Sequence, residues 1–164
     1  TIRLDPNYAG AWYNKGLVLS GRGKYDEAIK AFDEAIRLDP NYADAWYNKG
    51  LALSSQGKYN EAIKVFDEAT RLDPNHADAW YNKGLVFSGQ GKYDEAIKAF
   101  NEAIRLDPNY AGAWYNKGLV LSGRGKYDEA IKCYDEVIRL IPNDAGGWNN
   151  KDITLEAFQV PICQ

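Results

Sequence analysis

Apolar and polar positions along the chain follow a helical spacing in two successive stripes. In the segment 9–42, Trp12, Gly16 and Leu19 are separated by four and three residues, which places them on one face of a helix. A second stripe with the same period consists of Tyr25, Ala28, Phe32, Ala35 and Leu38. The pattern therefore predicts two amphipathic helices in this segment.

Glycine and proline separate the predicted helices. The letters SGRGK, residues 20–24, lie between the stripes, and two glycines there end the first helix and permit a tight reversal. The second helix is expected to stop at LDPN, residues 38–41, because Pro40 disfavours helix at Asp39 and has no backbone N–H to donate. Each segment is thus predicted to be an antiparallel helical hairpin.

The hairpin pattern recurs along the whole chain. The hexapeptide AWYNKG begins at Ala11, Ala45, Ala79 and Ala113, a period of 34 residues. Residues 9–30 and 111–132 are identical, so the chain contains an internal duplication. The predicted organisation is a tail of a preceding repeat at 1–8, full repeats at 9–42, 43–76, 77–110 and 111–144, and a terminal helix of an incomplete fifth repeat plus a tail at 145–164.

The repeat resembles the tetratricopeptide repeat family. Counted from Ala9, it has Trp at position 4, Gly at 8, a large apolar residue at 11, Tyr at 17, Ala at 20, Phe or Tyr at 24 and Pro at 32. The resemblance covers essentially the whole chain. It implies an all-α fold, a right-handed superhelical solenoid of antiparallel helix-turn-helix repeats whose first helices line the concave surface.

Some repeated residues are interpreted as packing residues. Glycine inside a helix costs about 1 kcal/mol relative to alanine, so Gly16 and its copies are expected to allow close approach of two helices, with Ala28 and its copies as the small partners. The tryptophans are expected to fill the space between neighbouring hairpins. Asp152 stands where the fifth copy should carry the glycine, which is consistent with a lone terminal helix that closes the stack.

Other repeated residues face the concave surface by resemblance and are the candidates for binding protein or peptide. They are Tyr13, Asn14, Leu17, Tyr47, Asn48, Leu51, Tyr81, Asn82, Leu85, Tyr115, Asn116 and Leu119. An asparagine amide both donates and accepts, so a row of asparagines suits the backbone of an extended peptide. The alternative is that the asparagines cap or cross-link adjacent repeats and that the tyrosines only pack along the inner helices.

The lysines of the hexapeptide, beginning with Lys15, occupy position 7, where the family usually has leucine. Each is expected to lay its methylenes on the neighbouring repeat and to send its ammonium group to water. The chaperone-binding members of the family hold a carboxylate with basic residues at positions 2, 5 and 6. This chain has Gly or Asp, Tyr and Asn there, so that clamp is not expected.

Composition excludes several classes of function. Charged residues make up 26% of the chain but the net charge is −3, so no basic field is available for nucleic acid. No apolar run approaches the ~18 residues that a membrane span requires, and a cytoplasmic location is the expectation. Cys133 and Cys163 lack metal-site spacing and are interpreted as free thiols. We expect no metal, no cofactor and no membrane contact.

The sequence also provides no catalytic constellation, because its only histidine, His76, replaces a tyrosine at a repeat junction. The predicted function is a non-enzymatic scaffold that binds protein or extended peptide on the concave face. Two alternatives stay open: a self-assembling structural module that stacks head to tail into a superhelix, and a regulatory or docking domain of a larger enzyme.

Overall fold

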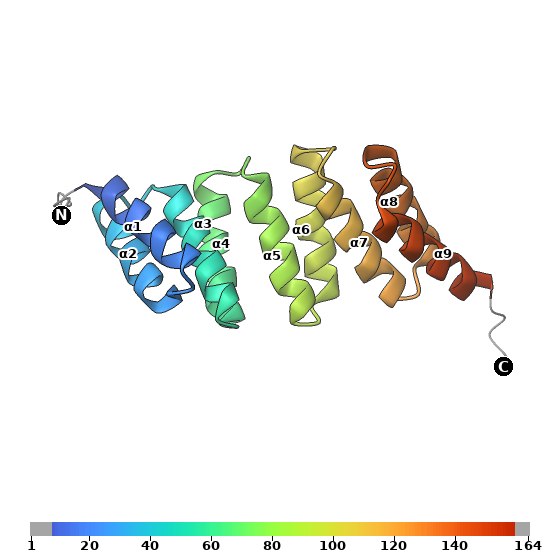
Figure 1. The fold of residues 1–164 in the computed structure, drawn as a ribbon, viewed down its shortest axis with the longest axis horizontal. Coiled ribbons are helices and arrows are strands. Elements are labelled where there is room, and N and C mark those ends of the chain that lie inside the picture. The colour runs from blue at the N-terminus through green and yellow to red at the C-terminus, as the bar shows by residue number, and fades with distance from the viewer. Residues whose placement is uncertain (1–7, 160–164) are drawn as a thin grey trace.

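All regular elements among residues 8–159, which the computed structural model describes, are α-helices (Figure 1). Four helix pairs are followed by one further helix. The bounds are α1 Ala9–Gly21, α2 Tyr25–Leu38, α3 Ala43–Ser55, α4 Tyr59–Leu72, α5 Ala77–Gly89, α6 Tyr93–Leu106, α7 Ala111–Gly123, α8 Tyr127–Leu140 and α9 Ala145–Gln159. The predicted tails, most of 1–8 and the residues after α9 with Cys163, lie outside the described residues.

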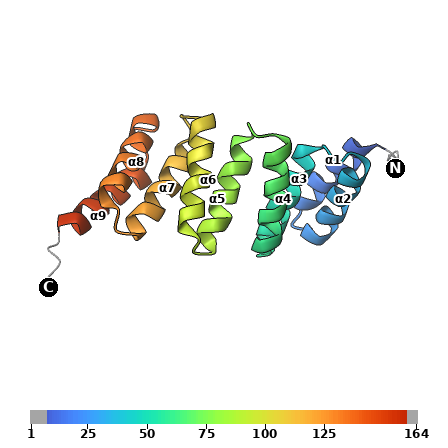
Figure 2. The same cartoon turned by 180° about the vertical axis from the view of Figure 1, so that it is seen from behind.

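The helices form a curved array of two layers, with α1 at one end and α9 at the other (Figures 1 and 2). Each first helix packs on its own second helix, and each second helix packs on the first helix of the next pair. Within the described chain, successive first helices contact one another while successive second helices do not. The first helices are therefore the crowded inner layer of the superhelical solenoid, which confirms the all-α fold predicted from the repeat.

The turn inside each pair follows from one glycine. Gly23 has a φ of +73°, and the N–H of Lys24 donates to the carbonyl oxygen of Leu19 at 2.9 Å while that of Gly23 donates to Ser20 at 2.9 Å. These two bonds satisfy carbonyls at the end of α1 and reverse the chain in a Schellman motif. Gly57, Gly91 and Gly125 take the same conformation. At the other end of the pair, Asp39 is extended before Pro40, as expected.

The glycine within each first helix faces an aromatic ring. A Cβ added to Gly84 would lie 2.6 Å from Cε1 of Phe100, so only glycine allows α5 to approach α6 this closely. Gly16, Gly50 and Gly118 are placed in the same way against Phe32, Phe66 and Tyr134. The prediction that alanine is the partner of this glycine was wrong, because the ring at position 24 reaches across the gap and alanine at position 20 is too short to do so.

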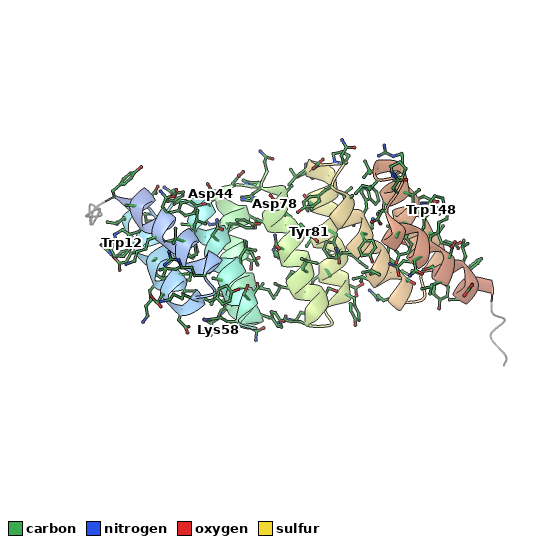
Figure 3. The ribbon with its side chains drawn as sticks, in the orientation of Figure 1. Trp12, Asp44, Lys58, Asp78, Tyr81 and Trp148 are labelled. Atoms are coloured by element: carbon green, nitrogen blue, oxygen red, sulfur yellow. The ribbon has the colours of Figure 1, made fainter. Side chains whose placement is uncertain are left out.

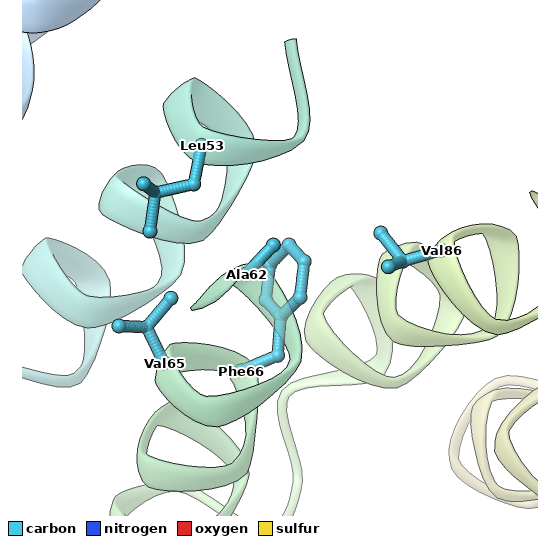
Figure 4. Close-up of a cluster of buried hydrophobic side chains, with 5 residues drawn as sticks. All are labelled: Leu53, Ala62, Val65, Phe66 and Val86. Atoms are coloured by element: carbon cyan, nitrogen blue, oxygen red, sulfur yellow. The ribbon is translucent and has the colours of Figure 1, made fainter. Parts of the chain in front are cut away.

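The alanines at position 20 instead belong to a core shared between neighbouring pairs. Figure 4 shows Ala62 and Phe66 of α4 with Leu53 of α3 and Val86 of α5. All are buried, and Val86 comes from the next repeat. Each hairpin therefore completes its core with a residue of its successor, which is why every copy needs the same packing residues.

Helix α9 closes this arrangement over α8. Thr154, the counterpart of Val86, is buried, and its hydroxyl lies 3.1 Å from that of Ser122. The opposite side of α9 is open, with Ile153 and Phe158 each more than half exposed. Asp152 is exposed, and no second helix follows α9 within the described residues. The glycine-to-aspartate change thus lies on the one first helix that has no second helix packed on it in the described part of the chain.

Candidate functional site

The candidate binding residues lie on the four first helices of the inner layer. Tyrosine, asparagine and leucine come from positions 5, 6 and 9 of α1, α3, α5 and α7. Leu17 and Leu119 are the most exposed of the leucines, while Leu51 and Leu85 are partly buried against the core. Asn14 is exposed, and the other three asparagines are half-buried. The inner face thus repeats one set of side chains every repeat.

The asparagines connect each repeat to the one before it. Asn82 Nδ2 donates to the hydroxyl oxygen of Tyr47 at 3.1 Å and to the backbone carbonyl of Asp78 at 2.9 Å. Asn48 bonds in the same way to Tyr13 and Asp44, Asn116 to Tyr81 and Gly112, and Asn150 to Tyr115. Both amide hydrogens of Asn82 are used. Its Oδ1 accepts no hydrogen bond from the described residues and is free to serve as an acceptor.

Three of the inner tyrosine rings, those of Tyr13, Tyr47 and Tyr81, each lie between two other rings. The centroid of Tyr47 lies 6.1 Å from that of Phe66 and 4.5 Å from that of His76. Burial, with the nearby Asp78 carboxylate and Tyr13, raises the pKa of Tyr47 to about 12, and burial also raises the pKa of Tyr13 and Tyr81. These hydroxyls stay protonated at neutral pH. The oxygen of Tyr47 accepts from Asn82, and its hydrogen has no acceptor among the described residues, so the hydroxyl can still donate.

Two carboxylates lie along one edge of the array, as Figure 3 shows for Asp44 and Asp78, while Lys58 lies at the opposite edge. The hydroxyl of Tyr110 donates to Oδ1 of Asp78 at 2.6 Å, and burial together with this bond raises the pKa of Tyr110. Nε2 of His76 lies 3.7 Å from Oδ1 of Asp44. Both carboxylates are therefore positioned beside a ring from the loop that enters the next repeat.

The chemistry of this surface is hydrogen bonding and apolar contact. His76 accepts from the backbone N–H of Ala79 through Nδ1 at 3.3 Å and so caps α5. Among the described residues, no group of three His, Cys, Asp or Glu side chains is arranged to hold a metal ion. The inner face can thus offer amide oxygens, phenolic hydroxyls and leucine side chains to a partner.

The sequence model of the tetratricopeptide repeat family matches residues 1–43, 13–77, 47–111 and 81–145, which together cover most of the chain. The chain belongs to the tetratricopeptide repeat family.

Solved structures of other proteins with this repeat are similar over most of the chain. The crystal structure of MamA superposes with a TM-score of 0.82 at 30% identity and covers 86% of this chain and 82% of MamA. MamA residues 41 to the end from Desulfovibrio magneticus RS-1 give 0.80 at 26% identity, with coverages of 94% and 92%. YrrB, described as a TPR protein with an unusual peptide-binding site, gives 0.81 at 25% identity, with coverages of 94% and 79%. No curated protein matches.

The sequence predicted that the repeated lysines send their ammonium groups to water, and this was wrong for three of them, which pair with a carboxylate instead. Lys83 Nζ lies 2.6 Å from Oδ1 of Asp67 in the preceding repeat and 4.7 Å from the ring centroid of Trp80. Lys49 pairs with Asp33 and Lys151 with Asp135 in the same way. The preceding repeat of Lys117 has Asn101 at this position, and the ammonium group of Lys117 lies 5.3 Å from the ring centroid of Trp114. Where the second helix of the preceding repeat carries an aspartate at this position, the carboxylate holds the lysine ammonium group against the protein.

The tryptophans fix each repeat to the loop that precedes it. Trp80 Nε1 donates to the backbone carbonyl of Pro74 at 3.2 Å. Trp46, Trp114 and Trp148 donate in the same way to Pro40, Pro108 and Pro142. Trp80 is half-buried, so its role combines packing with this bond. Sequence reasoning missed the bond, although the constant spacing of six residues between proline and tryptophan was visible.

The remaining predictions on the chain concern membranes and cysteines. No helix in the described part of the chain is long and apolar enough to cross a membrane. Cys133 is a free, buried thiol whose pKa burial raises to about 11. This thiol is therefore protonated at neutral pH and packs as an apolar residue.

Proposed function

We propose that this protein is a non-enzymatic interaction scaffold that binds an extended segment of a partner protein along the inner face of its first helices. The observation that carries the proposal is the hydrogen-bonding pattern of the tyrosine and asparagine side chains. At each internal junction, an asparagine oxygen without a partner in the described chain lies beside a tyrosine hydroxyl whose hydrogen is not used.

An extended peptide has matching groups, because its backbone presents N–H donors and C=O acceptors in alternation. The oxygen of Asn82 is suited to a peptide N–H, and the hydroxyl of Tyr47 is suited to a peptide carbonyl. The structural cross-link uses only the hydrogens of the asparagine amide. Cross-linking and peptide binding, which the sequence left as alternatives, are therefore compatible in the same residue.

Apolar area next to this row supports side-chain recognition. Leu17 is 38% exposed and Leu119 is 39% exposed, and both lie one helical turn from the asparagine of their helix. A peptide that places alternate side chains toward these leucines would bury apolar surface on each of them. The similarity to YrrB, whose description names a peptide-binding site, agrees with this class of function.

The test begins with capture of a partner from a lysate and identification of the bound segment by mass spectrometry, followed by titration of that segment as a synthetic peptide. We expect the double substitution Asn48→Ala and Asn82→Ala to weaken peptide binding at least tenfold, because it removes two side-chain oxygens that accept from the N–H groups of the peptide backbone. The matched control is Lys64→Ala with Lys98→Ala, two exposed residues of the outer helices α4 and α6.

The same asparagines also cross-link repeats, so the double variant is expected to melt at a lower temperature. Affinity is therefore measured well below the melting transition, where circular dichroism shows full helicity. A double variant that is fully helical and binds as tightly as the unmodified chain would disprove the proposal.

Head-to-tail self-association is a second candidate, and one observation favours it. Val18 of α1 is 56% exposed, whereas Val86, its counterpart in α5, is 5% exposed because the preceding repeat covers it. Another copy offering its own second helix would bury Val18 in the same way. Sedimentation over a range of concentrations tests this, and we expect Val18→Lys to abolish any association. A chain that sediments as a monomer at every concentration rules the candidate out.

A further inference from the structure

One junction of the array lacks a ring that the other three contain. The ring of Tyr42 packs in a tilted orientation on that of Tyr13 with centroids 4.9 Å apart, and the ring of His76 packs in the same way on that of Tyr47 at 4.5 Å. The ring of Tyr110 packs on that of Tyr81 at 4.8 Å, also tilted. In the fourth repeat the corresponding loop residue is Asp144, and the ring contact of Tyr115 is with the edge of Tyr134 at 6.3 Å.

A cavity of about 330 Å³ lies at this place. Its lining includes Tyr81, Tyr115, Asn116, Ile141 and Asp144. Two glycines, Gly112 and Gly146, also border it, at the repeat position where α3 and α5 carry Asp44 and Asp78. The cavity is therefore open because both the loop ring and the edge side chains are missing.

The hydroxyl oxygens of Tyr81 and Tyr115 already accept from Asn116 and Asn150, and two other polar groups of the cavity are acceptors with unused capacity. Oδ2 of Asp144 accepts from the backbone N–H of Gly147 at 2.6 Å, and its Oδ1 has no partner among the described residues. Asn116 uses its amide hydrogens on Tyr81 and on the carbonyl of Gly112, so its Oδ1 is likewise unpaired within residues 8–159. Among the described residues that line the cavity, Asp144 is the only charged one. The cavity is therefore suited to a cationic donor.

The apolar surfaces of the cavity define the shape of that donor. Tyr115 lacks the loop ring that packs on its counterparts, so its face is open to a planar group. Ile141 is 47% exposed and stands where the first three repeats have aspartate. A side chain with a planar, charged end and an aliphatic stem fits this combination. Its end can stack on Tyr115 and donate hydrogen bonds to the unpaired oxygens, while its stem covers Ile141.

We propose that the cavity binds an arginine side chain of the partner. The guanidinium group lies on the ring of Tyr115 and donates to Oδ1 of Asp144 and Oδ1 of Asn116, and the methylenes lie on Ile141. The proposal rests on the proposed function, because the arginine belongs to the segment bound along the inner face. Lysine is a poorer fit because its ammonium group is compact and strongly hydrated and cannot stack, and a neutral aromatic side chain would desolvate Asp144 without pairing it.

The test uses the full chain and four synthetic peptides of the form acetyl-Ala-Ala-X-Ala-Ala-amide, with X as arginine, citrulline, lysine or phenylalanine. Citrulline is the matched control, since it is planar and of similar size but carries no charge. Binding is followed by two-dimensional NMR of the ¹⁵N-labelled chain. We expect the arginine peptide to shift the signals of Tyr115, Asn116 and Gly146 and to bind at least tenfold more tightly than the citrulline peptide.

Two variants locate the binding. Asp144→Asn retains an oxygen for the N–H of Gly147 but removes the charge, and we expect it to weaken arginine binding at least tenfold. Asp144→Tyr supplies the ring that the other loops have, and we expect it to stack on Tyr115 and to abolish binding. Equal binding of the arginine and citrulline peptides, tighter binding of the phenylalanine peptide, or unchanged binding to Asp144→Asn would overturn the inference.

The outcome is separable from that of the proposed function. A captured segment that depends on Asn48 and Asn82, but not on Asp144, supports inner-face binding and eliminates the arginine site. Arginine binding that depends on Asp144, in a chain whose captured segment ignores Asn48 and Asn82, supports the site and eliminates the proposed backbone recognition.

Discussion

Helix α5 of the central hairpin and the terminal helix α9 occupy the same place in the repeat but differ in what covers them. Gly84 in α5 presses on the ring of Phe100, whereas α9 has the exposed Asp152 at that position. Both helices bury the side that faces the preceding repeat, through Val86 and Thr154. The difference lies on the other side, where α6 packs on Gly84 and where, within the described residues, no helix packs on the position of Asp152.

The tryptophans show the same difference in the extent of their burial. Trp80 is half-buried, with α6 packed on its helix, while Trp148 is 47% exposed. Both donate from Nε1 to a proline carbonyl, at 3.2 Å and 3.0 Å. The hydrogen bond is therefore a property of the junction with the preceding repeat, and the additional burial is a property of the hairpin.

The largest expected effect comes from placing the aspartate of α9 at the corresponding position of the central helix α5. Gly84→Asp puts a charged side chain against the buried ring of Phe100, and we expect a loss of more than about 4 kcal/mol in the free energy of unfolding. Chemical denaturation followed by circular dichroism measures it. Gly89→Asp is the control, because a side chain there meets open space. A central variant as stable as its control would show that α5 and α6 can separate without cost.

The next effect compares the two tryptophans. We expect Trp80→Ala to destabilise the array by about 3 kcal/mol, because it removes apolar burial and a hydrogen bond. Trp148→Ala should cost about 1 kcal/mol, since nearly half of that side chain is already exposed. Denaturant titration of both variants checks the ratio, and equal losses would contradict the difference in burial.

A smaller effect depends on pH and concerns the inner rings of the hairpins. The pKa of Tyr47 is raised to about 12, while a tyrosine in the unfolded chain titrates near 10, as for a model peptide. The unfolded state therefore loses its proton first, so the stability contributed by the neutral hydroxyl is complete below about pH 10 and is lost as the pH rises toward 12. We expect the melting temperature to fall less steeply with pH between about 10 and 12 in Tyr47→Phe than in the unmodified chain. An identical slope in both proteins would show that Tyr47 does not titrate in this way.

The smallest effect restores an ion pair to the one internal junction that lacks it. Asn101→Asp places a carboxylate opposite Lys117, as Asp67 stands opposite Lys83, and we expect a gain of about 0.5 kcal/mol at low salt. In a Lys117→Ala background the same substitution should gain nothing. Denaturation of the four proteins of this cycle, at low and high salt, measures the coupling.

Much of the candidate site could be predicted from the sequence, because repetition separates packing positions from surface positions. The tyrosines and asparagines of the inner helices were found by their spacing and by resemblance. Their bonds to each other were not, since Asn82 and Tyr47 are 35 positions apart and come together only through the angle between repeats. The arginine site was also missed, because it depends on the absence of a ring at Asp144 that matters only beside Tyr115.

The sequence by itself determined the period, the helix pairs and their turns, because these depend on residues close together in the chain. Gly23 and Pro40 act on their own backbone, and helical spacing acts within one helix. Only the tertiary structure decided that Phe100 lies against Gly84 and that Lys83 turns back to Asp67. These contacts depend on the distance and angle between helices. Both are set by the volumes of the side chains that pack at the interface, and a local sequence pattern does not specify them.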